Sequence, residues 1–131
     1  MVALEQYMRT RKRTVLIVAA VIVALLGLML LAGLVYMWTD PEYVALRQFE
    51  PAFNQIATGM AREEVERRLG PPDYTDKEFG LGQREGFEDA YERAAKSDAQ
   101  YYLFWHRGVD MVFTVGFNAA DEAVVIESGG T

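Results

Sequence analysis

The sequence predicts an α+β protein in which a single N-terminal transmembrane helix precedes one small folded domain. Three features of the 131-residue chain support this fold class: an uninterrupted apolar stretch at residues 15–38, apolar side chains at helical spacing between residues 40 and 70, and alternating apolar and polar side chains in the last third. Periods of about 3.6 and 2 residues are typical of helices and strands, respectively. We therefore expect short helices first and strands joined by short turns after them.

The apolar stretch at residues 15–38 contains no charged residue and no proline. As a helix it would be roughly 36 Å long at 1.5 Å per residue, enough to cross a hydrocarbon core of about 30 Å. The alternative is a buried core helix, but the remaining residues are too few to surround such a helix on all sides. We expect residues 1–14 to form a basic cytoplasmic N-terminus and residues 15–38 to cross the lipid bilayer.

The residues that flank this span predict its orientation. Basic residues lie close to the span only on its N-terminal side, and none follows within eight residues of its end; the basic cluster is Arg9, Arg11, Lys12 and Arg13. By the positive-inside rule, the N-terminus is cytoplasmic and the C-terminal domain extracytoplasmic. Tyr36 and Trp38 are typical of an aromatic anchor at the far interface. The apolar run exceeds the roughly 7–15 residues of a signal-peptide core, so we expect an uncleaved signal anchor.

Small residues recur within the span. Ala20, Ala24 and Gly27 fall near one helical face, a spacing that lets two membrane helices approach closely. Self-association or a partner helix on this face is one hypothesis, and ordinary membrane-helix composition is the alternative.

Charge and cysteine content exclude several classes of partner. Of the net charge of −6, residues 1–38 carry +3 and residues 39–131 carry −9. An acidic domain repels nucleic acid phosphates and anionic lipid headgroups, so we expect no nucleic acid partner. The chain has no cysteine, which excludes disulfides, thiolate metal sites and a lipid-bearing cysteine.

A helix is predicted to begin at Asp40-Pro41-Glu42, which supplies an N-cap, a proline at the first helical position and an acid in the first turn. Because proline interrupts a helix interior, Pro51 predicts a break after Phe49 or Glu50. We expect residues 39–50 to form a juxtamembrane helix or linker and residues 51–131 the folded domain. The apolar face of this region consists of Leu46, Phe49, Phe53 and Ile56.

A second helix is predicted at residues 62–69. Val65 and Leu69 face inward, whereas the charged residues form a solvated face. Gly70 supplies the residue with positive φ after the last turn, and the prolines that follow it prevent continuation.

One set of positions forms a recognisable motif: Phe53-x-x-Ile56-x-x-Gly59-Met60, then Glu64-Val65, then Leu69-Gly70-x-Pro72. This motif resembles that of the SmpA/OmlA domain, a BamE-like module of small outer-membrane lipoproteins that assist β-barrel assembly. The resemblance implies a two-layer ααβββ fold, two short helices packed on a three-stranded antiparallel sheet, and a place in the bacterial envelope.

The chain departs from this pattern in three respects. Ala61 stands where family members often have Ser or Thr as the helix N-cap. A membrane helix replaces the lipid-bearing cysteine, so we expect the inner membrane as location, with a periplasmic domain. A long polar segment is inserted before the first strand; within it, Phe87 and Tyr91 predict a short amphipathic helix at residues 85–96.

Three strands are predicted at residues 100–105, 109–117 and 123–127, with turns at residues 106–108 and 118–122. The odd-numbered apolar side chains from Val109 to Phe117 should face the helices. In the simplest hairpin register another group points to the opposite face: Tyr102, Phe104, Val112 and Thr114. This group is either an exposed protein-binding surface or a face covered by the inserted helix through Phe87 and Tyr91.

The sequence contains no recognisable catalytic, cofactor-binding or metal-binding motif. The single histidine, His106, falls in a predicted turn without a second metal ligand at suitable spacing, and no serine lies in a nucleophile elbow. We therefore expect no enzyme and no cofactor. Two functions stay open: a membrane-anchored extracytoplasmic protein-interaction module, accessory to envelope or outer-membrane protein assembly, or a small structural subunit of a larger membrane complex held through its transmembrane helix.

Overall fold

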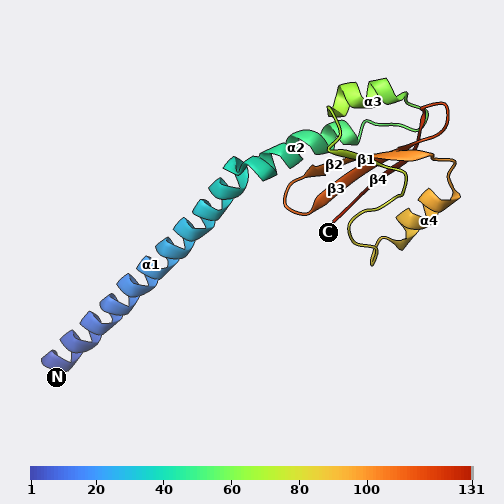
Figure 1. The fold of residues 1–131 in the computed structure, drawn as a ribbon. Helices are drawn as coiled ribbons and strands as arrows, with labels where there is room; N and C mark the ends of the chain where they lie inside the picture. The colour runs from blue at the N-terminus through green and yellow to red at the C-terminus, as the bar shows by residue number, and fades with distance from the viewer. Residues whose placement is uncertain (131) are drawn as a thin grey trace. The chain divides into compact units, whose positions relative to one another are not determined.

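The computed structural model describes residues 1–130 and divides into two compact units, Met1–Thr39 and Asp40–Thr131. The first unit is one helix, α1 (Val2–Thr39). It is longer than the predicted span because the basic residues before Val15 are helical as well. It is long and apolar enough to cross a membrane, and no residue of its most apolar window is buried. The second unit is a small α+β domain, as predicted (Figure 1).

The first helix of the domain, α2, spans Pro41–Phe53 and begins where predicted, with the Asp40 carboxylate accepting a hydrogen bond of 2.9 Å from the Glu42 N–H. The predicted break at Pro51 is wrong, because the helix continues through it. Pro51 lies in the last turn and has no N–H to donate to the carbonyl one turn earlier, but the helix continues past it, with Asn54 N donating to Glu50 O at 3.0 Å. Helix continuation also keeps Phe49 and Phe53 on one face.

Burial of those two rings explains why the helix tolerates the proline. Phe49 and Phe53 lie 4.8 and 4.9 Å from the Phe113 ring, centroid to centroid. Burying a large apolar side chain stabilises a fold by about 1.5–3 kcal/mol, so two such side chains offset a proline penalty of about 3 kcal/mol.

The second domain helix, α3 (Arg62–Leu69), has the predicted bounds. Gly70 follows it with a φ of 83° and donates its N–H to Glu66 O at 2.8 Å. Ala61 provides no side-chain cap; instead the Arg62 N–H donates to Asp121 O at 3.0 Å. A tertiary backbone contact thus replaces the Ser or Thr cap that the resemblance implied.

The sheet has four antiparallel strands in the order β1-β2-β3-β4, so the expectation of three is wrong. The strands are β1 (Tyr74–Asp76), β2 (Tyr101–Arg107), β3 (Met111–Phe117) and β4 (Ala123–Gly130). The sequence pattern missed β1 because its three residues are all exposed and carry no alternation. It joins the sheet through backbone pairing, with Thr75 opposite Leu103. The inserted segment therefore follows the first strand and does not precede it.

The inserted segment contains α4 (Glu88–Lys96), close to the predicted bounds. It packs on the face of the sheet opposite α2 and α3 (Figure 1). The domain consequently has three layers, helices on each side of one sheet, and the two-layer expectation is wrong.

The central strand, β3, explains this layering, because it is buried on both faces. Phe113, Val115 and Phe117 enter the larger core beneath α2 and α3, as their odd numbering predicted. Val112 enters a smaller core on the α4 side. Val109 does not belong to the strand: it lies 65% exposed in the turn that begins at Gly108, while His106 and Arg107 are the last residues of β2.

Replacing Phe113 with aspartate should unfold the domain. Phe113 is 1% exposed, and an unpaired carboxylate in an apolar core costs several kcal/mol, comparable with the total stability of about 5–15 kcal/mol for a typical domain. The measurement is loss of the cooperative near-ultraviolet circular dichroism transition in detergent. Val109→Asp is the matched control and should change stability by less than about 0.5 kcal/mol. A cooperative, protease-resistant Phe113→Asp variant would refute the strand register.

Candidate interaction surface

The predicted partner surface is a buried face. We call Tyr102, Phe104, Val112 and Thr114 the aromatic face; all four are at most 5% exposed. They project from β2 and β3 on the side of α4, as the hairpin register predicted. These side chains therefore do not form an exposed binding surface. They agree with the other interpretation, in which the inserted segment covers this face of the sheet.

The covering segment, residues 77–96, is larger than the predicted helix alone. Its loop contributes Phe79, whose ring lies 5.5 Å from Tyr102 and 4.9 Å from Tyr91. Leu81 is fully buried, and its N–H donates to the Tyr91 hydroxyl at 3.1 Å. We call this segment the cover. The sequence predicted Tyr91 as a covering residue, whereas Phe79 and Leu81 lie in a glycine-rich loop without periodicity.

Two glycines of the sheet make room for this packing. A Cβ on Gly116 would lie 2.6 Å from Tyr102 Cε1, and one on Gly129 would lie 3.2 Å from Leu81 Cβ and 3.3 Å from Phe87 Cε1. The cover also has a polar attachment, because Arg93 of α4 donates to both carboxylate oxygens of Glu127 on β4, at 2.5 and 3.0 Å. Such bidentate pairs fix geometry as well as adding energy.

A buried hydroxyl lies without a partner beneath the cover. Thr114 Oγ1 is fully buried and, among the described residues, accepts and donates no hydrogen bond. An unsatisfied buried polar group costs roughly 1–3 kcal/mol. Threonine at this position therefore lowers stability relative to an apolar residue of the same shape.

At the edge of the aromatic face, β1 places Tyr74 against two residues of β2 that lie far from it in the sequence. The Tyr74 ring stacks on Phe104 with centroids 4.5 Å apart, and its hydroxyl lies 3.3 Å from His106 Nε2. Partial burial raises the pKa of Tyr74, with the nearby Asp76 and Asp73 carboxylates adding to the effect. His106 is exposed, and its ring stacks on Tyr74 with the centroids 5.4 Å apart, an arrangement that supports packing.

A polar cleft opens on the other side of the sheet, between α2, α3 and the end of β2. Its volume is about 240 Å³. Arg68 and Arg107 line it together with an amide and a mainly apolar floor: Ala45, Gln48, Phe49, Ala52 and Leu69. We call it the arginine cleft. Sequence reasoning missed it, since Arg68 was assigned to a solvated helix face and Arg107 to a turn.

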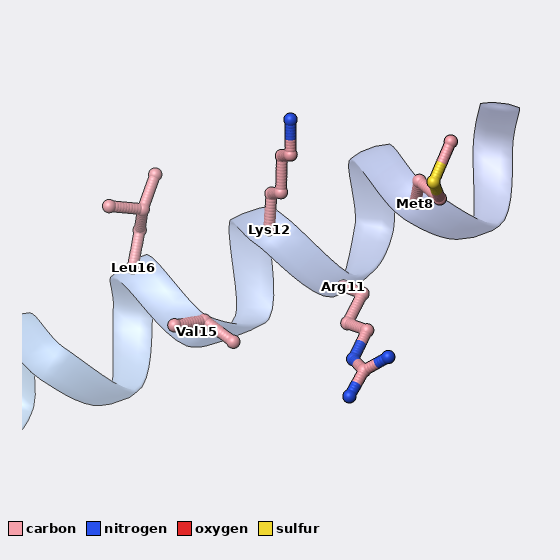
Figure 2. Close-up of a pocket in the computed structure, with 5 residues that line it drawn as sticks. All are labelled: Met8, Arg11, Lys12, Val15 and Leu16. Atoms are coloured by element: carbon pink, nitrogen blue, oxygen red, sulfur yellow. The ribbon is translucent and has the colours of Figure 1, made fainter.

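The residues assigned to membrane topology all lie on α1. Figure 2 shows Arg11 and Lys12 projecting from α1 in different directions, one turn before Val15 and Leu16. These residues and Met8 border a shallow depression on a single helix, which is a gap between neighbouring side chains and no enclosed cleft. Arg9 and Arg13 lie on the same stretch of α1, and Tyr36 and Trp38 are exposed in its last turn.

The small residues of the span, Ala20, Ala24 and Gly27, are exposed on α1, and nothing lies within 4 Å of a Cβ placed on Gly27. A partner helix on this face stays a hypothesis. Among residues 1–130, no group of three or more acidic or histidine side chains is placed to hold a metal ion.

Comparison with known proteins assigns no family to this chain. No family model matches the chain, and no curated protein matches it. One similar solved structure is described as an osmotically inducible lipoprotein, OsmE: it is 19% identical, with 70% of this chain and 86% of that chain covered and a TM-score of 0.39. A score of this size carries no argument about shared fold or function, and the resemblance to the SmpA/OmlA domain stays a prediction.

Replacing Gly116 with alanine should lower the free energy of unfolding by about 1–3 kcal/mol, because the new methyl group overlaps the Tyr102 ring. Urea denaturation followed by tryptophan fluorescence gives the measurement. Gly80→Ala is the control: nothing lies within 4 Å of its Cβ, so its stability should stay within about 0.5 kcal/mol. Equal stabilities for the two variants would contradict the packing of Tyr102 against the sheet.

Replacing Thr114 with valine should raise the free energy of unfolding by about 1 kcal/mol, since the change removes a buried hydroxyl without a partner and keeps the shape. The same denaturation measurement applies. Thr114→Ser retains the hydroxyl and deletes a methyl group, so it should lower stability by about 1 kcal/mol. A destabilised valine variant would show that the hydroxyl makes a favourable interaction.

Proposed function

We propose that this protein is a single-pass, membrane-anchored extracytoplasmic module that binds another protein. The observation that carries the proposal is α1: a 38-residue helix with an apolar window of mean hydropathy 3.2 and no buried residue. Exposed apolar surface of this extent requires a lipid or protein environment. The domain that follows builds its own core, so the helix adds nothing to that core and acts as an anchor.

The proposed orientation places the N-terminus in the cytoplasm and the domain in the periplasm of a bacterial inner membrane. The basic residues at one end of the apolar window support it, as does the pair Tyr36 and Trp38 at the other end. The absence of cysteine is compatible with an oxidising compartment. The resemblance to the SmpA/OmlA domain supports a role accessory to envelope or outer-membrane protein assembly.

A binding role fits the domain better than a catalytic one. The aromatic face is buried and contributes to the core, and the polar residues around it form structural pairs such as Arg93–Glu127. The outer surface of the domain is acidic, with a net charge of −9 over residues 39–131. Such a surface favours partners with basic patches and disfavours polyanions.

The alternative function is a structural subunit held in a larger membrane complex through α1. The exposed small residues of the span favour it, because they permit close helix contact. Replacing residues 15–38 with an unrelated apolar helix separates the two functions. Retained partner capture by the domain supports the module, whereas loss of assembly supports the subunit.

Protease treatment of sealed spheroplasts should digest the domain and leave a membrane-protected fragment containing α1. The control is a variant with Arg9, Arg11, Lys12 and Arg13 all changed to glutamine, in which loss of the positive charges should yield a mixture of orientations. Immunoblotting of the C-terminus gives the measurement. Digestion of the domain only after lysis would reverse the proposed topology.

A further inference from the structure

We propose that the arginine cleft binds the C-terminal carboxylate of a protein partner, whose last side chain is apolar. This inference rests on the proposed function and names the chemistry by which the module would recognise its partner. Three features carry it: two arginines line one small cleft, the guanidinium of one of them is held in a fixed position, and most of the other lining residues are apolar.

Arg107 is held in place before any ligand arrives. Its guanidinium lies over the Phe49 ring, 4.9 Å from Cζ to the ring centroid, and Nη1 donates to Asp73 at 3.0 Å and to the His106 carbonyl at 2.7 Å. These contacts use only Nη1 of the guanidinium, which carries five N–H donors on its three nitrogens. Within the described residues, the N–H groups of the other two nitrogens stay available to a ligand. A donor fixed in advance loses little conformational entropy on binding.

Arg68 approaches the same cleft from α3. Its Nε donates to Glu64 at 2.7 Å, which orients the side chain and leaves both terminal nitrogens without a partner among the described residues. Glu64 also accepts a hydrogen bond from Arg67, so one carboxylate serves two arginines. The Gln48 amide adds a further donor at the cleft, and no acidic side chain lines it.

The size and floor of the cleft select a chain terminus over other anions. Its volume of about 240 Å³ lies below the roughly 300–1,000 Å³ of pockets that enclose whole small molecules. Ala45, Ala52 and Leu69 offer apolar surface beside the donors. A C-terminal residue supplies a planar carboxylate for the guanidinium forks and an apolar side chain for this floor. An inorganic phosphate would leave the floor uncovered, and the acidic domain repels its second charge.

The test uses full-length protein in detergent micelles and a fluorescent peptide, Gly-Ser-Gly-Ala-Leu, with either a free or an amidated C-terminus. Fluorescence anisotropy should detect binding of the free acid and at least tenfold weaker binding of the amide. Arg68→Gln should weaken binding of the free acid at least tenfold. Arg67→Gln is the matched control, because Arg67 is the next residue on α3, shares Glu64 and does not line the cleft; it should bind normally.

Four results would overturn the proposal: no binding at millimolar peptide, equal binding of acid and amide, equal losses for Arg67→Gln and Arg68→Gln, or displacement of the peptide by inorganic phosphate at a lower concentration than unlabelled peptide. Circular dichroism of each variant verifies folding. Binding in micelles does not depend on membrane orientation. If the peptide does not bind but the domain is digested in sealed spheroplasts as predicted, only the proposed role of the cleft is rejected. If the peptide binds but the domain is digested only after lysis, only the proposed topology is rejected.

Discussion

The need to cover β3 on both faces determines the architecture of the domain. Its side chains are apolar or aromatic on the α2 side, and its other face carries Val112, Thr114 and a glycine that admits the Tyr102 ring. Burying one face of a sheet requires one layer of helices, and burying both requires two. The cover meets the second requirement. It belongs to the fold for the same physical reason as α2 and α3, although the chain adds it as an insertion between the first two strands.

The same constraint explains where the sequence was informative. Strong periodicity located α3 and the odd-numbered face of β3, and the cap residues located the start of α2. Local rules failed where tertiary contacts outweighed them. Pro51 should end a helix, but two phenylalanine rings packed on Phe113 keep the helix intact. The strand Tyr74–Asp76 has no apolar pattern, because backbone pairing and the stacking of one exposed tyrosine ring on Phe104 attach it to the sheet.

The two candidate sites show more clearly what sequence patterns cannot predict. Alternation identified the aromatic face correctly as a group, but periodicity along one strand cannot tell whether distant residues such as Phe79 and Leu81 cover it. The arginine cleft was beyond prediction, since Gln48, Arg68 and Arg107 come from three elements and each has a conventional local explanation. Only the packing of α2 and α3 against β2 brings them together, with Trp105 donating its indole N–H to the Gly70 carbonyl at 3.2 Å.

A single residue, Asp40, separates α1 from α2, and α2 is itself fixed to the sheet through Phe49. A junction of one residue adds almost no reach of its own, unlike a long flexible spacer, whose reach grows with its residue number. In the proposed topology, any partner must therefore arrive at the membrane surface or already reside in it. With a partner that already resides in the membrane, encounters would follow lateral diffusion in two dimensions, and their frequency would depend on the density of both proteins per unit of membrane area.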